Sequence, residues 1–139
     1  MSEPTGPSPG ASRLEAAQGF AMHIGHRDLD QAMALLSPAV TYQVSGDHPL
    51  AGVFSGSEAV ARHLCDLVER TLGTFEAVKW EDWLVGEHHV AAWADIQLRI
   101  QARRFAGRVL FLMRFDLSDK IDEIIVFFED QRAAERFFA

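Results

Sequence analysis

The residue whose surroundings best suit chemistry is Asp95, in the stretch AAWADIQLR. The alternation of this stretch predicts a strand with Trp93, Asp95 and Gln97 on one face. If this face lines a pocket, the indole ring forms an apolar wall, and the carboxyl group suits a general acid or base because burial raises the pKa of a carboxylic acid. The other face is equally apolar, so the alternative is that Asp95 faces solvent or a second subunit.

Two further candidates belong to the stretch TYQVSGDHPLAG, in which a predicted strand over 40–44 gives way to a turn. Tyr42 could donate a hydrogen bond to a substrate oxygen, or be a core tyrosine with its own partner. The imidazole of His48 exchanges protons near neutral pH, although Asp-His-Pro is also ordinary turn sequence. We expect the turn to border a pocket entrance, and we take Asp95, His48 and Tyr42 as candidate catalytic residues.

Other ionisable residues have competing structural explanations. Asp130 ends a predicted strand, where it lies at the pocket rim or, as we favour, caps a C-terminal helix. His63 lies at the edge of the apolar face of a predicted helix and either lines the pocket or is partly exposed. His23 and His26 have a spacing that metals use, but no third ligand accompanies them in sequence, so no metal site is predicted. Cys65 has no local nucleophile motif and is interpreted as a core residue.

Helical patterns fill the first half of the chain and strand patterns the second. Capping sequences and apolar periodicity predict helices over 12–25, 28–36 and 55–73. After them come four alternating or apolar runs, TFEAVKWEDWLVG, HVAAWADIQLRIQ, RVLFLMRFDL and KIDEIIVFFED, and a tail, QRAAERFFA, that predicts a short closing helix. This order predicts an α+β fold in which a cone-shaped, curved antiparallel sheet wraps around three N-terminal helices. We expect the site in the space between them.

Length and composition limit the number of domains, the cellular compartment and the kinds of partner that we expect. The chain of 139 residues has a net charge of −7 and one cysteine, which indicates a single domain in a reducing compartment and no broad nucleic-acid binding. No apolar run approaches the roughly 18 residues that span a membrane, and the first residues do not read as a signal peptide. We therefore expect a cytoplasmic protein with a flexible lead-in over 1–11 and one domain over 12–139.

The stretches HRDLDQAMALLSPAVTY, GDHPLAGVFSGSEAV and FDLSDKIDEIIVFFEDQRAAERFF resemble the nuclear transport factor 2-like superfamily, in its SnoaL-like and ketosteroid-isomerase-like branch. The resemblance covers about residues 14–138. It implies a cone-shaped barrel with an apolar internal pocket, usually in a homodimer. The superfamily includes isomerases, polyketide cyclases, epoxide hydrolases and non-catalytic binding or assembly modules.

The residues of ketosteroid isomerases are absent here. Those enzymes have a tyrosine on the first helix, a base aspartate after the first strand and a protonated aspartic acid in the penultimate strand. The matching positions hold Phe20, Val44 and Phe111, none of which can transfer a proton or donate a strong hydrogen bond. Related cyclases and epoxide hydrolases place acids on the central and last strands, where Asp95 and Asp130 are the candidates here.

These observations predict a small-molecule-binding protein with a mainly apolar pocket for a hydrophobic, partly oxygenated ring compound. If it is an enzyme, we expect a cofactor-free isomerase, cyclase or hydrolase that uses acid–base chemistry. The alternative is a non-catalytic dimeric ligand carrier or assembly module whose cavity is partly filled by its own side chains. Trp80 and Trp83, an odd step apart, face opposite ways on a regular strand, so we expect one of them at a subunit interface. The expected pocket-lining residues are Phe20, Val44, Phe54, His63, Trp93, Gln97, Phe111, Met113, Val126, Phe128 and Asp130.

Overall fold

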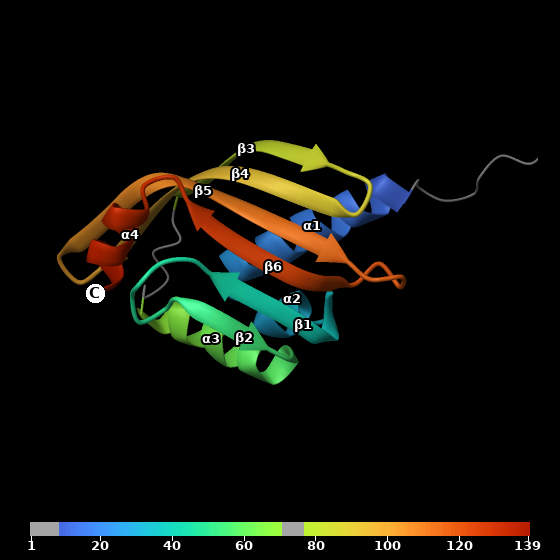
Figure 1. The fold of residues 1–139 in the computed structure, drawn as a ribbon, viewed down its shortest axis with the longest axis horizontal. Coiled ribbons are helices and arrows are strands. Elements are labelled where there is room, and N and C mark those ends of the chain that lie inside the picture. The colour runs from blue at the N-terminus through green and yellow to red at the C-terminus, as the bar shows by residue number, and fades with distance from the viewer. Residues whose placement is uncertain (1–8, 71–76) are drawn as a thin grey trace, which may run out of the picture.

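A six-stranded curved sheet is the main element of the computed structural model, which describes residues 9–70 and 77–139 (Figure 1). In chain order the strands are β1 (Leu36–Val44), β2 (Gly52–Ser55), β3 (Ala77–Val85), β4 (His89–Ile100), β5 (Arg103–Phe115) and β6 (Ile121–Phe128). In space their order is β2-β1-β6-β5-β4-β3. The α+β fold class is confirmed. The sheet is mixed rather than fully antiparallel, because the last strand, β6, enters between β1 and β5 and runs parallel to β1.

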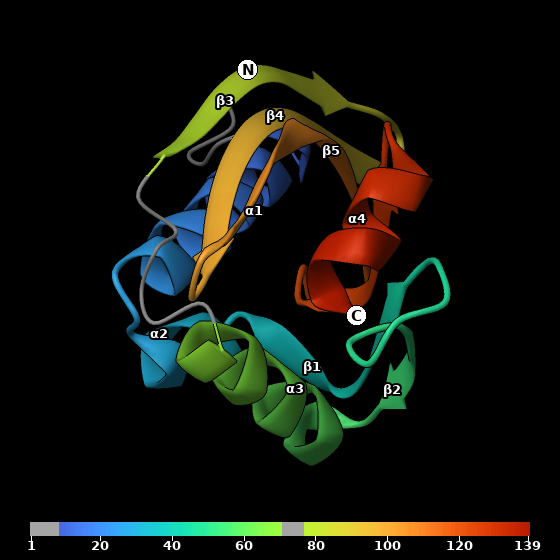
Figure 2. The ribbon, with the colours of Figure 1, turned by 90° about the vertical axis from the view of Figure 1, so that its left-hand side faces the viewer.

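Within residues 9–70 and 77–139, four helices accompany the sheet: α1 (Pro9–Gly25), α2 (Leu29–Met33), α3 (Ser57–Arg70) and α4 (Gln131–Phe138). The first three lie across the open, concave side of the sheet, and α4 lies at one end of it (Figure 2). Among the residues that the structure describes, no helix has both the length and the apolar character needed to cross a membrane. The interior of the protein is therefore bounded by strands on one side and helices on the other.

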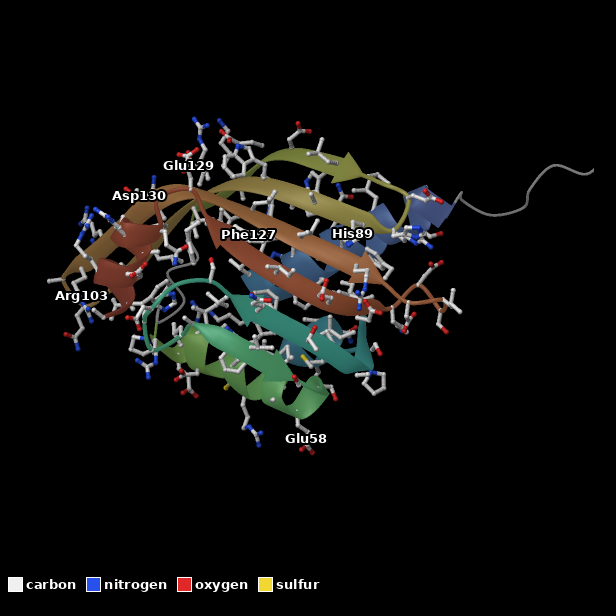
Figure 3. All side chains as sticks on the ribbon, in the orientation of Figure 1. Glu58, His89, Arg103, Phe127, Glu129 and Asp130 are labelled. Atoms are coloured by element: carbon white, nitrogen blue, oxygen red, sulfur yellow. The ribbon has the colours of Figure 1, made fainter. Side chains whose placement is uncertain are left out.

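Two aspartates start helices as predicted. The carboxylate of Asp28 accepts the N–H of Gln31 at 3.3 Å and begins α2. The carboxylate of Asp130 accepts the N–H of Ala133 at 3.0 Å and begins α4, which confirms the capping role favoured for this residue (Figure 3). Each cap satisfies an N–H that has no partner within the helix.

Other boundaries differ from the sequence predictions. Helix α1 begins at Pro9 rather than at the predicted Ser12 cap, because proline fits the first turn of a helix well. Strand β1 begins at Leu36, earlier than predicted, and includes a register shift between Leu36 and Thr41. The segment Gly52–Ser55, predicted as part of a turn, pairs with β1 as strand β2. Helix α3 begins at Ser57 instead of Ser55, and its predicted end over 71–73 lies outside the described residues.

A bulge in β3 changes the direction of two tryptophans. Trp80 pairs with Ala94, but Asp82 pairs with Trp93, so the register shifts by one residue between Trp80 and Asp82. The extra residue turns the strand, and Trp80 and Trp83 both face the interior with ring centroids 5.0 Å apart. The prediction that they face opposite ways is therefore wrong, because it assumed a regular strand.

Candidate functional site

A cavity of about 580 Å³ lies between the concave face of the sheet and the helices. Inward-facing strand residues such as Ile96, Val109 and Val126 form one wall, and Phe20 and Leu64 close it from α1 and α3. Sites for small molecules are typically lined mainly by apolar side chains and have volumes of roughly 300–1,000 Å³. The cavity has the size and the lining of such a site.

Aromatic rings cover the part of the wall that β3 and β5 supply. The ring centroid of Trp80 lies 5.0 Å from that of Trp83 and 5.7 Å from that of Phe111. All three side chains line the cavity and leave its interior open. They offer a flat apolar surface on which a ring compound can stack.

Tyr42 and His63 place polar groups in this apolar wall. Tyr42 lies on β1, and burial raises the pKa of its hydroxyl group above the usual value, so the phenol stays protonated. His63 lies on α3 and is only 5% exposed. Its ring stacks on Phe54 with a centroid distance of 4.1 Å and lies 5.1 Å from the ring of Tyr42.

His48 joins the cavity from the loop between β1 and β2. Its Nδ1 accepts the N–H of Leu50 at 3.2 Å, and its ring stacks on Phe138 of α4 with a centroid distance of 4.8 Å. Because Nδ1 acts as an acceptor, the uncharged ring carries its hydrogen on Nε2. The hydrogen bond from Leu50 sets the tautomer of this imidazole, and the contact with Phe138 helps to set the orientation of its ring.

The same loop is attached to β6 and α4 next to His48. Ser45 Oγ lies 3.1 Å from the carbonyl oxygen of Val126 and 3.1 Å from Oε1 of Gln131. Gly46 follows with φ of +114°, and a Cβ at this position would lie 2.0 Å from Nε2 of Gln131. Only glycine fits this backbone and this contact, so the loop that carries His48 has a defined path.

Two imidazole nitrogens in the wall have no hydrogen-bond partner among the residues that the structure describes. They are Nε2 of His48 and Nε2 of His63, and both atoms are buried. Burial lowers the pKa of His63 to about 4, Asp66 opposes this shift, and the charge of His48 adds to it. Burial also lowers the pKa of His48, although the Ser45 backbone and two nearby carboxylates, Glu135 and Asp47, favour the protonated ring. Both rings are uncharged at neutral pH.

The structure corrects the prediction for Asp95. Its strand neighbours Ala94 and Ile96 are buried on the inner face, so Asp95 lies on the outer face, between Lys79 and Arg108 on the adjacent strands. Trp93 and Gln97 share this outer face. The guanidinium carbon of Arg108 lies 6.0 Å from the centre of the Trp93 ring. The inner face carries the smaller residues because the helices and the cavity need that space, whereas the outer face accommodates an indole ring.

The other expected residues divide into two groups. Phe54 and Asp130 do not line the cavity: Phe54 packs against His63, and Asp130 caps α4. The structure places the remainder on the cavity wall, namely Phe20, Val44, His63, Phe111, Met113, Val126 and Phe128, together with the candidate catalytic residues Tyr42 and His48.

Several wall residues were missed by sequence reasoning. Trp80 and Trp83 were hidden by the bulge, although their apolar surroundings and large rings marked them as candidates. The exposed part of the wall consists of Gln18, Met22 and His26 with Gly25, at the end of α1. The cavity therefore opens beside α1, whereas the turn around His48, expected at the entrance, supplies His48 and Leu50 to the wall.

The wall contains no carboxylate, lysine or arginine within the described ranges 9–70 and 77–139. These ranges also contain no cluster of three or more side chains arranged to hold a metal ion. The side chains that can exchange a proton with a guest are therefore the histidines and Tyr42, and the amide of Gln18 can also form hydrogen bonds. This composition allows hydrogen bonding and imidazole chemistry in an apolar setting.

Comparison with known proteins identifies solved structures of the same fold. No protein-family model matches the sequence, and no curated protein matches it. Among solved structures, Bal32a from a soil-derived mobile gene cassette is 16% identical with a TM-score of 0.89, and covers 95% of this chain and 100% of its own. A protein of unknown function with a cystatin-like fold from Xanthomonas campestris is 23% identical (TM-score 0.83; 91% and 98% covered). A nuclear transport factor 2-like protein from Burkholderia xenovorans is 19% identical (TM-score 0.80; 96% and 100% covered). The protein therefore has the cystatin-like fold of nuclear transport factor 2-like proteins, as the sequence resemblance implied.

Proposed function

We propose that the protein binds a hydrophobic, partly oxygenated ring compound in the cavity between the sheet and the helices. The observation that carries this proposal is an apolar cavity of about 580 Å³ that contains two buried imidazole nitrogens without partners among the described residues. Burial of a ring against the aromatic wall supplies affinity, and the unpartnered nitrogens orient the oxygenated part of the guest.

Proteins of similar fold support a small-molecule site. A Mycobacterium tuberculosis protein with 18% identity and a TM-score of 0.73 is an LEH-like epoxide hydrolase. TerC, with 12% identity and a TM-score of 0.76, was co-crystallised with polyporic acid. A small-molecule guest in the cavity of this protein is consistent with both.

Cofactor-free acid–base catalysis is the second candidate function. It is favoured by the position of Tyr42, His48 and His63 on one wall, where an imidazole and a phenol face the same guest. In such a reaction His48 would donate through Nε2–H, because the Leu50 N–H already occupies the acceptor nitrogen Nδ1. Of these two imidazoles, His63 would accept the proton, as a weak base with a pKa of about 4. Asp95 has no part in this proposal, since it lies on the outer face. Substrate turnover that His48→Asn abolishes would support catalysis over binding alone.

The binding proposal is tested with an uncharged fluorescent guest. We expect N-phenyl-1-naphthylamine to bind saturably at one molecule per chain and to quench the emission of Trp80 and Trp83, which line the cavity. Val126→Trp fills the cavity and should weaken binding at least tenfold. The matched control, Glu123→Trp, adds the same ring on the other face of β6 and should bind like the wild type. Absence of saturable binding by the wild type, for this dye and for a panel of cyclic ketones, would refute the proposal.

We also propose that the outer face of the sheet joins two copies of the chain. Figure 3 looks onto this face, where Phe127 is 42% exposed. Its centre carries two rows of apolar cross-strand neighbours: Trp93, Leu110 and Phe127 in one row, and Ala91, Leu112 and Ile125 in the next. A continuous apolar area of this kind on a sheet favours association.

The charges beside these rows favour a second copy as the partner. Lys79, Asp95 and Arg108 lie on the neighbouring strands β3, β4 and β5, and Glu129 follows directly after the end of β6. Their charges alternate in sign, and Glu129 lies 3.9 Å from Arg108. If a second copy faces the first with this row reversed, each charge meets its opposite. Sedimentation velocity should show a dimer for the wild type and a monomer for Phe127→Glu, while Arg62→Glu, on the exposed side of α3, should remain dimeric. A monomeric wild type at micromolar concentration would eliminate the dimer.

A further inference from the structure

The unpartnered nitrogen of His48 provides the cavity with a hydrogen-bond donor. The Leu50 N–H donates to Nδ1, so the hydrogen of the uncharged ring lies on Nε2, which is buried and has no acceptor among the described residues. A buried donor without a partner destabilises a protein, and a guest that supplies an acceptor removes that penalty. This donor therefore distinguishes guests by the atom they place next to it.

The groups around the two histidines leave the interior without a fixed positive charge. His48 is influenced by the backbone of Ser45 in its own loop, by Glu135 of α4 and by Asp47, all of which favour the protonated ring. His63 is influenced by Asp66 of its own helix and contacts Tyr42 of β1. Neither carboxylates nor the side chains of lysine and arginine line the cavity in the described part of the chain. An anionic guest would lose its hydration without meeting a cation, unless an imidazole first took up a proton.

We propose that His48 makes the cavity selective for guests with an uncharged oxygen acceptor, over hydrocarbons and carboxylates of the same size. This inference rests on the proposed function, because it concerns the same cavity. An aromatic ketone satisfies Nε2–H of His48 and keeps the interior uncharged. A hydrocarbon leaves the donor unsatisfied, and a carboxylate binds only together with a proton.

Three probes of nearly equal shape separate these cases: 2-acetylnaphthalene, 2-ethylnaphthalene and 2-naphthoate. Each displaces N-phenyl-1-naphthylamine from the wild-type protein at pH 7.5. A hydrogen bond to a buried, otherwise unsatisfied donor corresponds to about tenfold in affinity, so the ketone should bind about tenfold more tightly than the ethyl compound. The carboxylate should bind more weakly than the ketone, also by about tenfold or more.

Two variants of His48 assign the effect to one nitrogen. In His48→Asn the amide oxygen can still accept the Leu50 N–H in place of Nδ1, but the group corresponding to Nε2 is removed, so the ketone should lose its advantage over the ethyl compound. In His48→Gln the amide N–H can replace Nε2–H, and most of the advantage should return. Asp47→Asn, which changes the exposed neighbour of His48, is the control and should keep the wild-type preference for the ketone.

Calorimetry gives a second readout that does not depend on the folding of the variants. The wild-type protein is titrated with each probe in two buffers of different ionisation enthalpy. Binding of 2-naphthoate should be accompanied by uptake of a proton, and binding of 2-acetylnaphthalene by none. Uptake should also make the carboxylate bind more tightly as the pH is lowered from 7.5 to 6.

The outcomes separate this inference from the proposed function. If neither the dye nor any probe binds, the binding function itself is refuted. If all probes bind but the ketone has no advantage, or if the carboxylate binds best without proton uptake, binding stands and the selectivity of His48 is refuted. If His63→Phe removes the ketone preference while His48→Asn keeps it, the donor has been assigned to the wrong histidine.

Discussion

Replacement of His63 by phenylalanine should remove a large part of the acid sensitivity of the fold. The wild-type imidazole is 5% exposed, packs on Phe54 at a ring distance of 4.1 Å, and has a pKa of about 4 against an ordinary value of 6.5. Above pH 6.5 the ring is uncharged in both the folded and the unfolded chain, so it contributes no pH dependence. Between pH 6.5 and 4 His63 binds a proton in the unfolded chain but stays uncharged in the folded chain, so the unfolding free energy falls as the pH falls.

The size of the effect follows from the two pKa values of His63. They differ by about 2.5, and each unit corresponds to about 1.4 kcal/mol, so the loss of unfolding free energy approaches about 3 kcal/mol at pH 4. The phenyl ring of His63→Phe can keep the stacking on Phe54 but cannot bind a proton. The stability difference between wild type and variant should therefore change by about this amount between pH 7.5 and 4.

Urea denaturation at half-unit steps of pH measures both proteins, and the variant supplies the background from all other titrating groups. Proton NMR of His63 in the folded wild type provides an independent check, because its ring signals should not titrate above pH 5. Parallel stability curves for the two proteins, or a His63 titration near pH 6.5, would show that burial does not hold this ring uncharged.

Three further changes test other parts of the structure. Asp130→Ala removes the N-cap of α4 and should lower the unfolding free energy by about 1 kcal/mol in urea denaturation. An unchanged denaturation midpoint would show that this cap does not stabilise the fold. Gly46→Ala introduces a Cβ against Gln131 at a φ of +114° and should lower the unfolding free energy by about 1–3 kcal/mol. It should also weaken dye binding, because it displaces the loop that carries His48. An unchanged unfolding free energy and an unchanged dye affinity would argue against this path of the loop. Asp95→Asn changes a carboxylate on the outer face and should leave dye affinity unchanged in a fluorescence titration, so a loss of affinity would contradict its placement.

Local signals in the sequence predicted the parts of the fold that depend on neighbouring residues. The caps at Asp28 and Asp130 could be recognised because a helix N-terminus needs an acceptor within three residues. The four long strands and the closing helix likewise followed from alternation and turn residues. The short strand Gly52–Ser55 was missed because its partner, β1, and not its own sequence, makes it a strand.

The site depended on information that is not local. The stretch around Asp95 alternates on two apolar faces, and only the packing of the helices decides that the alanine face is internal. The bulge that turns Trp83 inward is defined by pairing with β4. The ring of His48 stacks on Phe138, which lies far away in sequence, so residue type suggested a proton carrier but did not give its position in the wall. The hydrogen bond that sets its tautomer is local, because it comes from Leu50, two residues further along the chain.

The parallel pairing of β1 with β6 has a consequence for synthesis on the ribosome. Ser45 and Val126, which meet beside this pair, are 81 residues apart in sequence, and β6 separates β1 and β2 from the meander of β3 to β5. Until residues 121–128 leave the exit tunnel, the nascent chain consists of two sheet fragments with unpaired edges. Such late, long-range closure is slow and exposes strands to aggregation, so chaperone contact during translation should be concentrated on the β1 and β5 edges until the final strand arrives.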